Sequence, residues 1–322
     1  MTPNTFAYQL SINEEVSSFS DLAHISGTEN ALFTWIHIDI NDDASVKWLR
    51  NGEYALDDLV INALLADETR PRYTGIGDGA IVILRGVNLN ENADPEDMIS
   101  IRLWITKNFV ISVQRRPLKA IRDMRDRFDK DKPLKSSGEF VALLVHRLLE
   151  RMSPTLVSLD DTLDHIEEQM MERADAAFRE HITHARRQAL ILRRYIAPQR
   201  DVIGNLKMSD LDIITAQSKQ SLQESYNQNT KFVEDLDALR ERGAIVRDEL
   251  ATAISDRLNK NMYILSVISA IFLPLGFLTG LLGVNIGGIP GTENQNAFYI
   301  FSSIMIFLTA IQIFIFKKLK WF

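Results

Sequence analysis

The sequence of 322 residues contains no cysteine. This absence excludes disulfide bonds, thiolate zinc sites and cysteine nucleophiles, and it is typical of proteins that face a reducing compartment. The first residues also lack the basic and apolar regions of a signal peptide, so we expect none. Because no nucleophile, histidine and acid stand in a triad-like pattern, we expect no enzymatic activity.

Basic charge is scarce in the body of the chain. The net charge is −7, and residues 1–260 hold 42 acidic against 33 basic side chains once Glu293 and the three lysines of the tail are set aside. An acidic body argues against nucleic acid as a partner and is compatible with cations.

Charge is missing altogether from two long stretches near the end of the chain. Residues 263–284 and residues 297–316 form uncharged apolar runs of 22 and 20 residues. A hydrocarbon core about 30 Å thick needs about 20 helical residues, so we predict two transmembrane helices. The alternative, two buried helices of a soluble core, is disfavoured because uncharged runs of this length are rare in soluble proteins.

The basic residues around these runs predict their orientation. Arg257 and Lys260 precede the first span, and a basic tail at 317–322 follows the second, whereas the loop at 285–296 has no lysine or arginine. The positive-inside rule then places both termini in the cytoplasm and the loop outside, in the periplasm if the cell is a bacterium with an inner membrane.

The first part of the chain, residues 1–130, has the pattern of an α/β domain in which helices pack on a mixed sheet. Period-two or continuous apolar runs predict strands, and helical spacing predicts helices between them. The expected strands are 31–40, 80–88, 98–105 and 109–115, and the expected helices are 57–67 and 117–128.

Residues 131–208 are predicted to form cytoplasmic helices that pack on a stalk. We expect a break or a kink at Ser153-Pro154, then a helix over about 155–172 and another over about 176–205. Pro198 lies inside the last of these, where a proline should bend or divide the helix.

A single apolar stripe then runs for more than forty residues in steps of three or four. Its members are Phe232, Leu236, Leu239, Gly243, Val246, Leu250, Ile254, Leu258, Met262, Leu265, Ser269, Leu273 and Gly276. The stripe predicts one continuous helix from about Ser209 to Gly283, roughly 110 Å long, with a stalk part at 209–262 and a local bend at Pro274. Such a helix must pack against other helices, of its own chain or of copies.

Small side chains are concentrated in the first span and bulky ones in the second. The small residues are Ser266, Ser269, Ala270, Gly276, Thr279, Gly280 and Gly283. Two helices cannot enclose an aqueous pore, and small residues let helices of several copies approach closely. We therefore expect the first span to line an axis and the second to surround it in contact with lipid. The alternative is a plain membrane anchor.

Asn285 follows the first span directly. In a symmetric ring, each copy would place one amide carbonyl at the pore mouth, where it can accept hydrogen bonds from the water shell of a divalent cation. The alternative is that Asn285 only caps the helix.

At this point the chain resembles the CorA-type divalent metal ion transporters. The resemblance lies in GVN at 283–285, in FLPLGFLTG at 272–280 before it, and in the terminal KKLKWF. The signature of the family is Gly-Met-Asn, and Val284 replaces its methionine. The stretches GVNIGGIPG at 283–291, DETRPR at 67–72 and RRYIAPQRDV at 193–202 are similar to the zinc-transporting ZntB branch.

The resemblance implies a funnel-shaped homopentamer that transports a divalent cation, most simply Zn²⁺, by uptake coupled to protons, with no permanently bound cofactor. It places Gly283, Val284 and Asn285 at the selective pore mouth. Its pore-lining or gating positions are Met262, Leu265, Ser269, Leu273 and Gly276. These five also belong to the apolar stripe, and the larger ones are natural gates by dewetting unless they merely pack together. A magnesium or cobalt channel is the second hypothesis, and a membrane-anchored sensor or scaffold is the third.

Two weaker patterns lie on the predicted helices. His181 and His184 are three residues apart and could hold zinc on one helical face, although a solvated surface pair is the plainer interpretation. Asp160, Asp161 and Asp164 could attract cations, but we expect a solvated helix face.

Overall fold

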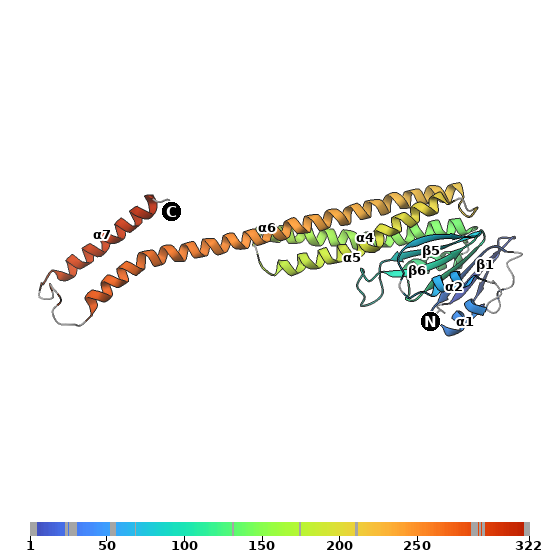
Figure 1. Ribbon diagram of the computed structural model, residues 1–322, viewed down its shortest axis with the longest axis horizontal. Coiled ribbons are helices and arrows are strands. Elements are labelled where there is room, and N and C mark those ends of the chain that lie inside the picture. The colour runs from blue at the N-terminus through green and yellow to red at the C-terminus, as the bar shows by residue number, and fades with distance from the viewer. Residues whose placement is uncertain are drawn as a thin grey trace. The chain divides into compact units, whose positions relative to one another are not determined.

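The computed structural model describes residues 5–22, 25, 31–51, 56–67, 69–130, 132–173, 175–209, 212–284, 289, 291 and 294–318. The chain divides into two compact units, residues 1–248 and residues 249–322 (Figure 1).

A seven-stranded sheet lies at the centre of the first unit, in the order β2-β1-β3-β7-β6-β5-β4. Its strands are β1 (Phe6–Ser11), β2 (Val16–Phe19), β3 (Ala31–Asp39), β4 (Arg72–Ile76), β5 (Gly79–Gly86), β6 (Ile99–Ile105) and β7 (Phe109–Gln114). Only β3 and β7 pair in parallel, so the predicted mixed sheet is confirmed. Strands β1, β2 and β4 were not predicted from the sequence. Of these, β2 and β4 are short, largely exposed edge strands without a clear apolar alternation.

One face of the sheet is covered by two short helices, α1 (Asp43–Asn51) and α2 (Asp58–Leu65). Alternate residues of the central strands, such as Ile36, Ile83 and Ile111, bury their side chains in this layer. Helix α2 was predicted, and it begins where the Asp57 carboxylate accepts a hydrogen bond from the Leu59 amide. Helix α1 was not predicted.

The opposite face carries the long helices α3 (Lys119–Asp129), α4 (Ser137–Glu172) and α5 (Phe178–Met208). Trp35 of β3 lies between Phe128 of α3 and Phe140 of α4, with ring centroids 5.4 and 4.9 Å away. Fully buried aromatic side chains of this size anchor both helices to the sheet. In Figure 1, α4 and α5 run side by side above the strands.

A break or a kink was expected at Ser153-Pro154, and the break is absent because α4 runs unbroken through Pro154. Helix α5 likewise continues through Pro198 and is not divided. An internal proline removes one hydrogen bond and costs about 3 kcal/mol in a helix. Buried residues on both sides of Pro154, Met152 and Leu156 among them, offset that penalty by packing on the same side of α4.

The last long helix, α6 (Ala216–Gly283), begins later than the predicted Ser209. Ser209 ends α5 instead, since its amide donates to the carbonyl of Leu206. Thr215 supplies the start of α6, because its hydroxyl oxygen accepts from the amide of Ser218 at 3.2 Å. From there the helix is continuous to Gly283 and includes Pro274, as expected.

In the first unit, the predicted stripe of α6 is buried. Phe232, Leu236, Leu239 and Val246 are all less than a tenth exposed. The stripe in this part of α6 therefore packs within the chain itself, without a second copy.

The second unit consists of the remainder of α6 and of α7 (Ala297–Lys318). Both stretches are apolar and long enough to cross a membrane. The expected fold class, a mixed α/β sheet domain followed by a long helix and two apolar C-terminal helices, is confirmed.

Candidate functional site

The apolar part of α6 and the whole of α7 are almost unburied. In the most apolar 18-residue stretch of α6 only 6% of residues are buried, and in that of α7 none is. A helix that served as the core of a soluble domain would be covered by its own chain, so the alternative of two buried core helices is wrong. An exposed apolar surface of this extent requires lipid or other copies as its surroundings.

The few shielded residues of the first span share one face. Val267 is 7% exposed, and Ala270, Ile271, Leu275 and Leu278 are half-buried. With about 100° per residue, these five positions occupy an arc of roughly 140° on the helix.

The predicted pore-lining residues occupy the other face. Met262, Leu265 and Leu273 are 62%, 64% and 72% exposed, and Ser269 and Gly276 are exposed as well. At about 100° per residue they span an arc of roughly 80°, centred nearly opposite to the shielded face. The chain therefore leaves the whole predicted lining uncovered.

Three glycines follow the same exposed face. A side chain added at Gly276, Gly280 or Gly283 would meet nothing within 4 Å. By contrast, a Cβ at Gly138 of α4 would lie 2.3 Å from the carbonyl oxygen of Ile213, so that glycine is needed inside the chain. Nothing within the described chain explains the small size of the three glycines of the span.

Two hydroxyl groups of the span are satisfied within the helix. The Ser266 hydroxyl donates to the carbonyl of Met262 at 2.8 Å, and the Thr279 hydroxyl donates to the carbonyl of Gly276 at 3.0 Å. Bonds of this kind let hydroxyl side chains lie in apolar surroundings at little expense. Both residues are thus suited to helix contacts or to lipid.

The predicted pore mouth is described in part. Gly283 ends α6, and Val284 follows with 45% of its surface exposed. Asn285 lies outside the described residues, as do Gly287 and Gly288 of the loop.

His181 and His184 are both exposed on α5. His184 lines a cavity of about 400 Å³ together with Asp94, Glu96 and Asp97. Asp97 is engaged by Arg116, which holds the pKa of its carboxyl below the usual range. Across the described part of the chain, no three histidine or carboxylate side chains are placed to hold one metal ion.

An arginine of α6 holds the acidic face of α4, a contact that the sequence analysis missed. Arg242 pairs with Asp160, Asp164 and Glu167. Asp160 and Asp164 remain more than half exposed, so the expectation of a solvated face is confirmed, and the ion pairs with Arg242 are an addition to it. Glu167 and Asp164 raise the pKa of the guanidinium further above its usual value, with the hydrogen bond that Arg242 donates to Glu167 as the largest cause. The acidic residues of α4 do not by themselves indicate that they pair with an arginine 75 residues further along the chain.

Most of the chain is similar to proteins of one known family. A family model described as CorA-like Mg²⁺ transporter protein matches residues 30–318. The divalent cation transporter CmaX of Pseudomonas aeruginosa is 35% identical over 289 residues, which are 89% of this chain and 87% of that protein. The zinc transport protein ZntB of Yersinia enterocolitica is 31% identical over 316 residues, covering 98% and 95% of the two chains.

A solved structure extends the similarity to the fold. The structure of the full-length CmaX protein matches with a TM-score of 0.84 and 32% identity, over 99% of this chain and 98% of that one. The fold of this chain is therefore similar to that of CmaX over nearly its full length.

Proposed function

This chain belongs to the CorA family of divalent-cation transporters, and we propose that copies of it assemble into a zinc-conducting pore lined by the apolar part of α6. The observation that carries this proposal is the exposed stripe on that helix. Its residues point away from the shielded face, and the glycines beside them have a size that only neighbours outside the chain would require.

The proposed assembly is a homopentamer in an inner membrane. The two spans of one chain cannot enclose a pore, whereas a ring of lining helices, one from each copy, can. The number of five copies is taken from the resemblance to the family. Helix α7 would form the outer ring. Its large apolar side chains Phe298, Ile306 and Phe314 are each at least 67% exposed, and such a surface is suited to contact with lipid. The basic tail beginning at Lys317 and Lys318 supports an orientation in which both termini would face the cytoplasm.

Conduction would need no nucleotide hydrolysis. A doubly charged ion that moves inward gains about 4.6 kcal/mol per 100 mV of membrane potential. Met262, Leu265 and Leu273 would form apolar rings that close the pore by dewetting. In the same arrangement Asn285 would lie at the outer mouth and bind the hydrated ion through its amide oxygen.

Zinc is the proposed cargo for two reasons. Val284 replaces the methionine of the family signature, and a relative covered over 95% of its length is named as a zinc transport protein. Magnesium, or cobalt, is the second candidate, because the matching family model is described as a Mg²⁺ transporter.

Proton coupling requires a titratable group close to the ion path. Residues 261–322 contain no histidine or aspartate, and Glu293 is their single glutamate. We therefore assign the proton-sensitive step to Glu293, in the loop between the spans. His181 and His184 are proposed as a weak zinc site on α5, which water or another copy would have to complete.

Ion flux in proteoliposomes tests the proposal. The full-length protein is reconstituted, and Zn²⁺ and Mg²⁺ entry are compared with and without an inward proton gradient. We expect saturable Zn²⁺ entry that exceeds Mg²⁺ entry and rises with the gradient. Glu293→Gln should remove the dependence on the gradient while flux continues.

The role of the pore mouth is tested in the same assay. Asn285→Ala should reduce Zn²⁺ entry at least about tenfold, as expected for a lost contact of a charged ligand. Gln295→Ala, which removes an exposed amide from the same loop, is the matched control and should leave entry unchanged. Absence of flux for either ion, together with a dimeric mass, would favour the membrane-anchored sensor or scaffold instead.

A further inference from the structure

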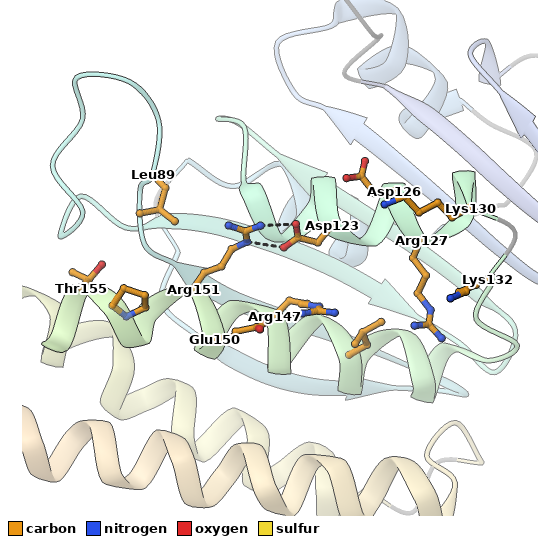
Figure 2. Close-up of a pocket in the computed structure, with 12 residues that line it drawn as sticks. Leu89, Asp123, Asp126, Arg127, Lys130, Lys132, Arg147, Glu150, Arg151 and Thr155 are labelled. Carbon is orange, nitrogen blue, oxygen red and sulfur yellow. Dashed lines mark hydrogen bonds and ion pairs between the residues drawn. The ribbon is translucent and has the colours of Figure 1, made fainter. Parts of the chain in front are cut away.

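A cleft in the first unit lies between α3 and α4, away from both apolar helices. Its volume is about 580 Å³, within the range of small-molecule sites. It is lined by residues of α3 and α4, by Leu89 from the segment after β5, and by Lys130 and Lys132 from the segment after α3. In Figure 2, the side chains of Asp123, Arg127 and Arg151 extend into the space between α3 and α4.

Most of the charged side chains in the cleft are basic. Five lining residues are cationic, Arg127, Lys130, Lys132, Arg147 and Arg151, and three are acidic. This local excess contrasts with the acidic body of the chain, in which carboxylates outnumber basic groups. An anion near the cleft is therefore attracted by it while the surrounding surface repels the same anion.

Two of the three carboxylates are already paired. Asp123 receives both arms of the Arg151 guanidinium, one at 2.6 Å from Nε, and this pair is drawn at the middle of the cleft in Figure 2. Glu150 pairs with Arg147 one turn away on α4. Asp126 is the only acidic lining residue without such a partner among the described residues.

Three of the cations have no ion-pair partner in the part of the chain that the structure describes. Within the described residues, Arg127, Lys130 and Lys132 make no salt bridge and no side-chain hydrogen bond. Figure 2 shows Arg127 and Lys132, which come from α3 and from the segment after it, at the same end of the cleft. Like charges held near one another repel, and a multivalent anion would relieve this repulsion.

The other end of the cleft is apolar. Leu89 and Pro154 line it, and Figure 2 places Leu89 and Thr155 at the end away from Lys132. The unpaired cations and the apolar end are thus separated by the two ion pairs in the middle. A ligand that fits has several negative charges at one end and a flat or apolar group at the other.

We propose that this cleft binds an organic polyphosphate of nucleotide type. Arg127, Lys130 and Lys132 hold the phosphate groups, for which the guanidinium fork and the compact ammonium are both suited. Leu89 and Pro154 contact the base. The ligand class follows from the charge and shape of the cleft alone, so the proposal does not depend on which ion the protein carries.

Calorimetric titration of the full-length protein in detergent tests the site. ATP, AMP and inorganic tripolyphosphate are titrated in the presence of a chelator, so that no metal ion links the ligand to the pore. We expect saturable binding of ATP, weaker binding of AMP because it carries fewer charges, and a loss of affinity as salt rises.

A matched pair of double variants locates the binding. R127Q/K132Q removes two of the cleft cations and should weaken ATP binding at least about tenfold, since hydrogen bonds to charged groups are the strong ones. K119Q/R122Q removes the same charge from exposed positions of α3 that do not line the cleft, and its affinity should equal that of the wild type. Circular dichroism of both variants confirms that the helices are intact.

Three results would overturn the proposal. Absence of saturable ATP binding by the wild type would show that the cleft is not a ligand site or is filled by a neighbouring copy. Equal weakening by both double variants would show that the anion binds to overall charge. Equal affinity for ATP and tripolyphosphate would remove the organic part of the ligand and the contact at Leu89.

Discussion

The guanidinium of Arg242 on α6 meets the carboxylate of Glu167 on α4 in a two-pronged contact. Its Nε and one terminal nitrogen each lie 2.7 Å from a different oxygen of Glu167. Because Asp160 and Asp164 approach the same guanidinium, one cation joins three carboxylates of α4. This contact joins α6 to the helices that cover the sheet.

Loss of this contact should destabilise the first unit. We expect Arg242→Gln to lower the free energy of unfolding by about 1–2 kcal/mol, less than a fully buried pair because both partners are about a third exposed. Arg247→Gln is the control, since Arg247 pairs with its neighbour Asp248 on the same helix. Urea unfolding followed by tryptophan fluorescence measures both, and equal midpoints would refute the role of Arg242.

The absence of cysteine makes the proposed pore wall directly measurable. Single variants Ser269→Cys and Leu273→Cys should react with a water-soluble thiol reagent in proteoliposomes, and the modification should block Zn²⁺ entry. Ile271→Cys and Leu275→Cys lie on the shielded face and should be protected. Equal reactivity of the two pairs would show that the stripe does not face water.

Two glycines should respond to alanine in opposite ways. Gly138→Ala should lower the melting temperature, because its Cβ would overlap the Ile213 carbonyl and overpacking costs about 1–3 kcal/mol. Gly280→Ala meets open space in the chain and favours the helix by up to about 1 kcal/mol. It should nevertheless shift the mass of the purified oligomer downward, as seen by light scattering. An unchanged mass would argue against close helix contact at Gly280.

The stability of the first unit should depend on His37. This side chain is fully buried beside Trp35 and Ser112, and burial lowers its pKa to about 3. Because the unfolded chain binds a proton near pH 6.5 and the folded chain does not, stability is complete above pH 6.5 and falls as the pH drops toward 3.

Between pH 7 and pH 5 this linkage should remove about 2 kcal/mol of unfolding free energy. The variant His37→Phe isolates it, because other acid-sensitive groups remain in both proteins. Urea unfolding at the two pH values should show a larger loss for the wild type than for the variant. The same loss in both proteins would mean that His37 is protonated in the folded state.

The sequence predicted best the continuity of α6 and the positions of the central strands, because both depend on the spacing of apolar residues along the chain. Helix α6 continues to Gly283 because its stripe is unbroken through Pro274, and the strands β3, β5, β6 and β7 lie where apolar runs occur. Of the break or kink expected at Pro154, the break does not occur, because the proline rule considers only the backbone and not the buried side chains on either side. The start of α6 was misplaced for a similar reason, since Ser209 and Thr215 are equally good caps until the end of α5 occupies one of them.

The amino-acid sequence alone determines the two apolar spans, their length, and the helical face on which the small residues lie. It can do so because insertion into a bilayer depends mainly on the length of an apolar segment and on its lack of charge. Folding alone decided which of those residues are shielded, which carboxylates Arg242 joins, and that Arg127 and Lys132 share one end of a cleft. Those relations join residues brought together by packing between helices and a sheet, and their energies depend on distances that no linear pattern contains.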